Sequence, residues 1–333
     1  MCSLRHDDQT GLMTSFTFDI GTMAQRDRLT LRDDLAALPF IGPFMLVFLV
    51  FIGYPLFYSL YISLHRVTIF SDFYNVFGTM EWVGLGNYTK VLSDPILWWS
   101  IALTFIYAIL TIFFGLVLSL ALALLLNKSR RGFGLMRSGF FLPNVFDVYV
   151  VGVIWLLIYN PNGGLFTYLL SWINAGDLAR QGVLNNPWLT LPAIALAMIL
   201  KNAGFGMILF LTALNNINES IFEAADVDGA TWFQKLWHIT LPLLKPIILF
   251  LTITGLVGSL NAFAEIYAMT DDTGGTSIQI AGQTLSSARL SGYHLYKVFN
   301  ESMYGEAAAI SFVLLGIALV ISWVNFKVLS TKD

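Results

Sequence analysis

Residues 223–242 read EAADVDGATWFQKLWHITLP, a polar stretch that separates two apolar segments, each long enough to cross a membrane. Ser220 precedes Glu223 by three positions, and Thr231 precedes Gln234 by the same spacing. This spacing is typical of the capping box that begins an α-helix. The stretch therefore predicts two short helices, one after the other.

The turn between these helices is predicted at Gly229, because a residue without a Cβ adopts a sharp turn at little cost. Pro242 and Pro246 are expected to end or bend the second helix. Together these features define a loop over residues 215–246. Bulky apolar residues recur at helical spacing in the second helix, so the loop needs a surface to pack on: Trp232, Phe233, Leu236 and Trp237.

The composition is that of a membrane protein. Hydrophobic residues make up 56% of the chain, charged residues only 12%, and the mean hydropathy is +0.71. Soluble domains carry roughly twice that share of charge. The net charge of -3 gives no indication of a nucleic-acid partner. Cys2 is the only cysteine, so an internal disulfide is excluded, and no metal site is predicted.

The pattern of apolar runs predicts an all-α integral membrane protein with about six transmembrane helices. Residues 1–38 are polar, lack the apolar core of a signal peptide, and are expected to form a cytoplasmic tail before a transmembrane domain over residues 39–330. Each later run has roughly the 20 residues that a membrane span requires. The expected spans are residues 39–64, 98–126, 139–159, 189–214, 247–269 and 307–327.

The distribution of Lys and Arg predicts the orientation of these spans. With the N-terminus in the cytoplasm, the inner segments hold twelve of these cations and the outer segments five. Lys201 lies inside the fourth span. The excess on the inner side favours cytoplasmic N- and C-termini, and it places the loop of residues 215–246 in the cytoplasm.

The loop also carries the pattern E-A-A, three residues, G, nine residues, I-x-L-P, which resembles the coupling loop of permease subunits in binding-protein-dependent ABC importers. The outer stretches at residues 81–88 and 160–164 resemble the carbohydrate-uptake branch of that family, which includes maltose, glycerol-phosphate and oligosaccharide importers. The resemblance covers roughly residues 39–327. It is carried in the loop by Glu223, Ala224, Ala225, Gly229, Ile239, Leu241 and Pro242.

This resemblance implies a type I importer permease that imports an oligosaccharide or related sugar by alternating access across the bacterial inner membrane. The implied partners are a homologous second permease, two ATPase subunits, a periplasmic or lipid-anchored solute-binding protein and membrane lipid. The ATPase subunits would hold ATP and Mg, and this chain would hold no cofactor. The residues implied at the ATPase contact are Glu223, Ala224, Ala225, Asp228, Gly229 and Ala230.

Ionisable residues inside the spans are candidate functional groups, because an unpaired charge in lipid costs several kcal/mol. They are Asp147, Lys201 and Glu265. The expected depths of Asp147 and Lys201 are similar, so the two are expected to form a buried ion pair. Such a pair would be either a static lock or part of a substrate path. Lys201 also raises the option of an acidic sugar.

Polar and aromatic side chains at similar depths are candidates for lining the path of a sugar. Amides and carboxylates pair with sugar hydroxyls, and aromatic rings stack on the apolar face of a pyranose. Asn261 and Glu265 are expected to share one helix face at positions i and i+4. Each candidate could equally make a bond between helices. They are Asn144, Tyr149, Trp155, Lys201, Asn202, Asn261, Phe263 and Glu265.

No catalytic residue is predicted. The chain contains no G-x-x-x-x-G-K-[ST] phosphate loop, no H-E-x-x-H and no G-x-S-x-G motif. Energy for transport must then come from another subunit. Two alternatives remain at this stage: a secondary transporter that uses Asp147 and Glu265 for ion binding, and a membrane scaffold that does not transport.

Overall fold

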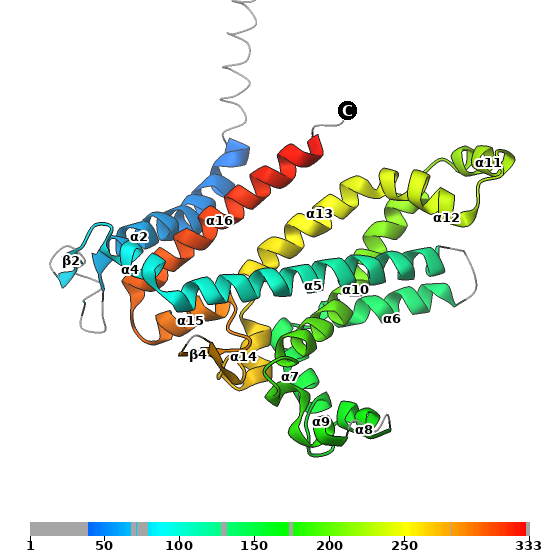
Figure 1. Cartoon of the computed structure of the whole chain (residues 1–333). Coiled ribbons are helices and arrows are strands. Elements are labelled where there is room, and N and C mark those ends of the chain that lie inside the picture. Colours follow the sequence, from blue (N-terminus) through cyan, green and yellow to red (C-terminus); the bar gives the residue numbers. More distant parts are fainter. Residues whose placement is uncertain are drawn as a thin grey trace, which may run out of the picture. The chain divides into compact units, whose positions relative to one another are not determined.

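The computed structural model describes residues 39–67, 71, 79–127, 132–172, 176–280 and 282–330. The predicted cytoplasmic tail, residues 1–38, lies outside this part of the chain. The chain divides into a unit of residues 1–59 and a unit of residues 60–333, and each is described by itself. Figure 1 shows that helices dominate the described residues.

The described part of the first unit is one apolar helix. It belongs to the span Pro39–Ser63, close to the predicted first span of residues 39–64. The helix widens into a π-turn, η1 (Leu49–Gly53), and continues as α2 (Tyr54–Ser63). Its large apolar side chains are exposed, as a helix that faces lipid requires.

Four further long apolar helices lie in the second unit, and each overlaps a predicted span. The central one, α10, packs against α5 and α13, and also against the shorter helix α6 (Phe133–Val145). Asp94 starts α5 by accepting a hydrogen bond from the Ile96 backbone N–H at 2.9 Å, with Pro95 in the first turn. These helices are α5 (Pro95–Leu126), α10 (Thr190–Asn215), the helix Trp232–Leu260, which includes α13 (Leu241–Leu260), and α16 (Tyr304–Ser330).

The predicted third span, residues 139–159, is not straight. It consists of α6 and α7 (Val148–Ile158), which meet at an angle of 101°. Pro143 lies in the last turn of α6, and Asp147 begins α7 as its N-cap. The described residues therefore contain five helices long and apolar enough to cross a membrane, or six when this bent pair counts as one span.

The predicted fifth span, residues 247–269, is wrong at its outer end. The long helix ends at Leu260, Asn261 is its C-cap, and a separate helix, α14 (Ala264–Thr270), follows. Asn261 and Glu265 thus do not share a helix face. α14 instead packs against α7, beside the bend.

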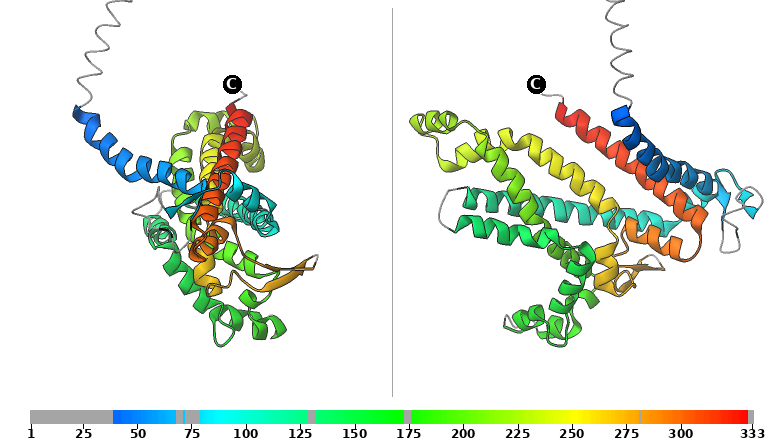
Figure 2. Two further views of the ribbon diagram at one scale, coloured as in Figure 1. Left: turned by 90° about the vertical axis from the view of Figure 1, so that its left-hand side faces the viewer. Right: turned by 180° about the vertical axis from the view of Figure 1, so that it is seen from behind.

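Short elements connect the spans on the side away from the 215–246 loop. Figures 1 and 2 show α8 and α9 near the start of α10, and the helices of that loop at its other end. Both small sheets are antiparallel hairpins, with His65 opposite Trp82 and Ile278 opposite Leu285. The elements are β1 (His65–Arg66), β2 (Glu81–Trp82), α4 (Gly86–Ser93), α8 (Leu165–Trp172), α9 (Gly176–Gln181), η2 (Val183–Asn185), β3 (Ser277–Ile280), β4 (Gln283–Ser286) and α15 (Ser291–Asn300).

Small residues allow α10 to approach its neighbours closely. A Cβ on Gly204 would lie 2.0 Å from the Phe140 carbonyl oxygen of α6, and a Cβ on Gly206 would lie 2.4 Å from Ser119 Oγ of α5. Ser119 Oγ donates a hydrogen bond to the Ala203 carbonyl oxygen at 3.0 Å. α10 continues unbroken through these glycines, so here they serve packing.

His294 is buried in α15 between groups of opposite charge. Its Nδ1 accepts a hydrogen bond from Arg289 Nε at 3.1 Å, and its Nε2 lies 4.0 Å from Asp94 Oδ2. Burial and the charge of Arg289 lower the pKa of His294 to about 4, against the attraction of Asp94. The ring is therefore neutral in the folded protein at pH 7.

We expect stability to fall as the pH is lowered from about 6.5 to about 4. Over this range the unfolded chain binds a proton at His294 and the folded chain does not, which costs about 1.4 kcal/mol per pH unit. Above pH 6.5, His294 is neutral in both the folded and the unfolded chain, so its contribution to the free energy of unfolding no longer changes with pH. Melting temperatures of the detergent-solubilised protein should show the slope, and His294→Gln should flatten it. An equal slope in the variant would contradict this assignment.

Candidate functional site

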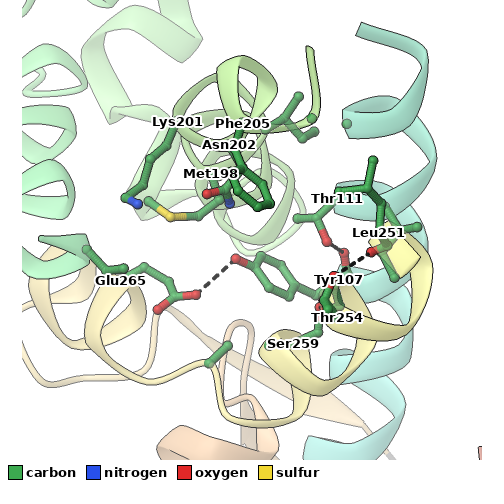
Figure 3. A pocket seen from close by; sticks show the side chains of 18 of the residues that line it. Tyr107, Thr111, Met198, Lys201, Asn202, Phe205, Leu251, Thr254, Ser259 and Glu265 are labelled. Carbon is green, nitrogen blue, oxygen red and sulfur yellow. Dashed lines mark hydrogen bonds between the residues drawn. The ribbon is translucent and has the colours of Figure 1, made fainter. Parts of the chain in front are cut away.

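A cavity of about 480 Å³ opens between α5, α10 and α13, next to the break between α13 and α14. Its size lies within the usual range of ligand pockets, roughly 300–1,000 Å³. Figure 3 shows side chains from these helices around it. Five of the predicted path residues line this cavity: Lys201, Asn202, Asn261, Phe263 and Glu265.

Lys201 is the buried cation of this cavity. The residue is 7% exposed, and it lies on α10. Figure 3 shows its side chain extending toward the side of the cavity where Glu265 lies. Within the described ranges, its ammonium group has no hydrogen-bond acceptor and no carboxylate within 4.0 Å. The group is thus available to whatever enters the cavity.

Glu265 faces the same cavity from the first turn of α14 and is 8% exposed. Its Oε1 accepts a hydrogen bond from the hydroxyl of Tyr107 on α5 at 3.0 Å. This bond links α5 to α14 across the cavity wall and fixes the direction of the carboxylate (Figure 3). A carboxylate held in this way can accept hydrogen bonds from ligand hydroxyls.

The predicted ion pair between Asp147 and Lys201 is not formed. The bend between α6 and α7 makes Asp147 the N-cap of α7, where its Oδ1 accepts a hydrogen bond from the Tyr149 N–H at 2.8 Å. Asp147 still attracts Lys201 electrostatically, but from beyond ion-pair distance. Neither a static lock nor a shared site joins them in this structure.

The other predicted path residues lie outside the cavity lining. Asn144 donates a hydrogen bond to Asn202 Oδ1 at 3.3 Å and so contacts a lining residue. Tyr149 lies 6.1 Å from Tyr267, centroid to centroid. Trp155 packs on the apolar core beside Tyr159. Their role in a substrate path stays a prediction.

Sequence reasoning missed the lining residues of α5. Tyr107 and Thr111 lie in an apolar stretch of sequence and line the cavity. The Tyr107 hydroxyl donates a hydrogen bond to Glu265, and the Thr111 hydroxyl donates one to the Tyr107 carbonyl oxygen. A tyrosine that is 3% exposed in the middle of a span needs a partner for its hydroxyl, which is the signal that could have found it. Ser119 of α5, and Thr254 and Ser259 of α13, also contribute hydroxyl groups to the lining.

The loop of residues 215–246 contains one short helix, α11, and the start of a second. The prediction that the second helix is also short is wrong, because it continues to Leu260. The capping box of Thr231 and Gln234 is present and begins α12 (Trp232–Lys235). The predicted box of Ser220 and Glu223 is wrong, because Asn218 caps α11 (Glu219–Val227) by accepting from the Ser220 N–H at 3.1 Å. Glu223 therefore lies in the middle of α11 with its side chain exposed.

Gly229 makes the turn between α11 and α12 in a left-handed conformation, with φ +73°. The Ala230 N–H donates to the Ala225 carbonyl at 2.9 Å, and the Gly229 N–H donates to the Asp226 carbonyl at 3.1 Å. This pair of bonds is a Schellman motif, which ends a helix most easily at glycine. An ion pair between Asp226 and Lys235 then holds the two helices together.

The apolar face of this helix pair is unpartnered within the described chain. Trp232, Phe233 and Trp237 are 64%, 62% and 57% exposed. Glu223, Ala224, Asp228 and Gly229 are also exposed, whereas Ala225 is buried and Ala230 half-buried. Four of the six predicted contact residues are therefore exposed, and Figure 1 shows α11 and α12 at the end of α10 away from α8 and α9.

The prolines after α12 do not end the helix. The helix widens into a π-turn, η3 (Leu236–Thr240), and then continues as α13. Pro242 lies in the first turn of α13, and Pro246 lies inside it. Trp232–Leu260 is thus one continuous helix of 29 residues. It reaches from the exposed helix pair to the cavity.

Comparison with protein families matches residues 115–328, more than half of the chain, to the family described as binding-protein-dependent transport system inner membrane component. The chain belongs to this permease family. The match includes the helix pair, the cavity-lining parts of α10 and α13, and most of α16.

Named relatives place the permease in the carbohydrate-uptake branch. The lactose transport system permease protein of Rhizobium radiobacter is 32% identical over 308 residues, covering 91% of this chain and 98% of the relative. The trehalose/maltose transport system permease protein of Thermococcus litoralis is 32% identical, covering 86% of this chain and 91% of the relative. Both are permeases, so the expectation that this chain is not an enzyme is confirmed.

Solved structures confirm the fold of the permease. A chain of a bacterial ABC transporter involved in the import of the acidic polysaccharide alginate has a TM-score of 0.73 at 23% identity, covering 92% of this chain and 100% of the other. The same kind of transporter in complex with an alginate pentasaccharide-bound periplasmic protein gives a TM-score of 0.69 at 22% identity, covering 92% and 96%. The all-α importer fold is thus shown, and the permease is a multi-pass inner-membrane protein.

Proposed function

We propose that this permease carries an oligosaccharide or related sugar across the bacterial inner membrane by alternating access, driven by ATP hydrolysis on separate ATPase subunits. The observation that carries the proposal is the continuous helix Trp232–Leu260, which connects an exposed helix pair to a polar cavity. Movement of α11 and α12 by a partner would reach the cavity wall directly. Rigid helices are the usual carriers of such changes.

The exposed residues of α11 and α12 support the proposal that this helix pair contacts an ATPase subunit. Glu223, Asp228 and Gly229 are exposed on it, and the aromatic face of α12 offers apolar area for a groove on the partner. ATP and Mg are assigned to that partner, and no cofactor to this chain. A homologous second permease would close the pore, and a periplasmic or lipid-anchored solute-binding protein would deliver the sugar.

The cavity suits a sugar because it combines amides, a carboxylate, an ammonium group and an aromatic ring. Asn202 and Asn261 can both donate and accept hydrogen bonds, Glu265 can accept and Lys201 can donate. Phe263 presents a ring to the lining, against which the apolar face of a pyranose can stack.

The orientation proposed has both termini in the cytoplasm. The C-terminal end of α16 lies on the same side as α11 and α12 (Figures 1 and 2), so both would share the side on which the ATPase subunits act. The excess of Lys and Arg in the inner segments supports the same orientation.

Uptake into proteoliposomes that contain the complete complex tests this function. We expect labelled oligosaccharide to accumulate only with ATP and binding protein, and to do so in the presence of an uncoupler. Glu223→Ala should reduce substrate-stimulated ATPase activity at least tenfold in complexes that still assemble. Uptake that an uncoupler abolishes would instead indicate an ion-driven transporter, and an absence of uptake with intact assembly would indicate a scaffold.

A further inference from the structure

We propose that the transported sugar carries a monoanionic acid group, a carboxylate or a sulfonate, and that Lys201 Nζ binds this group in the cavity. The proposal rests on the proposed import function and names its substrate class. A uronic acid residue in an oligosaccharide would supply the carboxylate.

The first observation is the isolation of the ammonium group. Lys201 is 7% exposed on α10, lines the cavity and lacks a partner within 4.0 Å among the described residues. A buried ammonium group that makes no hydrogen bond and no close ion pair is unfavourable. Neutral hydroxyls would relieve this only in part, whereas an anion would form a charge-assisted hydrogen bond.

The second observation is that the two carboxylates that attract Lys201 electrostatically are hydrogen-bonded to other groups. Asp147 caps α7 through the Tyr149 N–H, and Glu265 Oε1 accepts the Tyr107 hydroxyl. Both carboxylates attract the Lys201 ammonium group from beyond ion-pair distance, so they favour its charged form without forming a hydrogen bond to it. The side of Lys201 that faces the cavity is left for the ligand.

The third observation is the division of charge within the cavity. Among its lining residues, Lys201 carries the positive charge and Glu265 the negative charge. An acidic sugar would therefore enter with its acid group toward Lys201, because Glu265 would repel it. Glu265, Asn202 and Asn261 would then meet ring hydroxyls. One cation matches one negative charge, which favours a monoanion over a phosphate dianion.

Binding to the purified complex without its binding protein tests the assignment, since the binding protein would otherwise dominate selectivity. The probes for calorimetry are an aldotriouronic acid, which carries one carboxylate, its carboxyl-reduced neutral counterpart, and a methyl 6-deoxy-6-sulfoglucoside with its neutral methyl glucoside. We expect at least one acidic probe to bind about tenfold more tightly than its neutral partner. The acid that shows the preference identifies the anion.

Variants then assign the preference to Lys201. Lys201→Met should abolish the preference for the acid, and Lys201→Arg should retain most of it. Lys90→Met removes a lysine that pairs with Glu306 outside the cavity, and it should leave the preference unchanged. Size-exclusion profiles check that each complex assembles.

The outcomes separate this proposal from the import function. Equal binding of acidic and neutral probes by the wild type, or a preference that survives Lys201→Met, would overturn the role of Lys201. If neutral sugars alone are bound and imported with ATP, the acidic substrate class fails while import stands. If no sugar, acidic or neutral, is imported, both fail.

Discussion

Replacing Gly229 by proline is expected to abolish ATP-driven sugar uptake. Proline fixes φ near -65°, whereas Gly229 requires +73°, and proline also lacks the N–H that bonds the Asp226 carbonyl at 3.1 Å. The turn between α11 and α12 would open, and the ion pair of Asp226 with Lys235 would lose its geometry. Residual uptake below about a tenth of wild type is expected, because an unsuitable backbone conformation costs on the order of 1–3 kcal/mol and the hydrogen bond to the Asp226 carbonyl is lost as well.

A matched variant separates conformation from steric bulk at this position. A Cβ on Gly229 would meet no atom within 4 Å, so the site has space for a side chain. Asparagine tolerates the left-handed conformation better than other residues with a side chain. Gly229→Asn should therefore retain most of the uptake. Equal loss in both variants would show that the surface at Gly229, not its backbone angle, matters.

The second large effect is expected from Gly204→Ala. The new Cβ would lie 2.0 Å from the Phe140 carbonyl oxygen and 2.7 Å from the Phe141 Cα, so backbone atoms of α6 would have to move. We expect α10 and α6 to separate and the free energy of unfolding to fall by about 3 kcal/mol or more. Denaturant titration of the purified complex, followed by tryptophan fluorescence, measures this change.

Gly139→Ala is the control for that experiment, because Gly139 lies on α6 and a Cβ there would meet nothing within 4 Å. Alanine is the better helix former by about 1 kcal/mol, so the control should be neutral or slightly stabilising. A similar loss in both variants would show that α6 tolerates no substitution, and the close contact at Gly204 would not be the cause.

Local signals in the sequence predicted the elements well and their ends less well. The capping box of Thr231 and Gln234 is confirmed, because all of its atoms lie within one helical turn. The box at Ser220 failed because Asn218, two residues earlier, is also a good cap and starts the helix first. Competition between neighbouring caps cannot be resolved from spacing alone.

The spans were predictable from hydropathy, but their breaks were not. Hydropathy averaged over about 20 residues does not detect a bend, so it does not predict the 101° angle between α6 and α7 beside Asp147. The combination of Pro143 with a capping aspartate four residues later was the available signal. The same limit applies to Asn261, where the fifth helix ends.

The cavity could be predicted in part, because polar residues inside apolar spans are few and must face other protein groups or a cavity rather than lipid. Lys201 and Glu265 were identified for this reason, and both line the cavity. Their partners depend on how helices are rotated relative to each other, which periodicity within one helix does not determine. The bond of Glu265 to Tyr107 on α5 depends on that rotation. The bend between α6 and α7, in turn, makes Asp147 the N-cap of α7 rather than a partner of Lys201.

The unbroken helix from Trp232 to Leu260 can transmit a movement from the exposed helix pair to the cavity. At 1.5 Å per residue its 29 residues extend about 43 Å, so a tilt of about 3° around the midpoint displaces each end by about 1 Å. Such a lever delivers motion only while it stays stiff, and its π-turn at Leu236–Thr240 is the place where it would flex. In the proposed mechanism, a softer turn would let the ATPase subunits hydrolyse ATP without moving the cavity wall, which is a futile cycle with a mechanical cause.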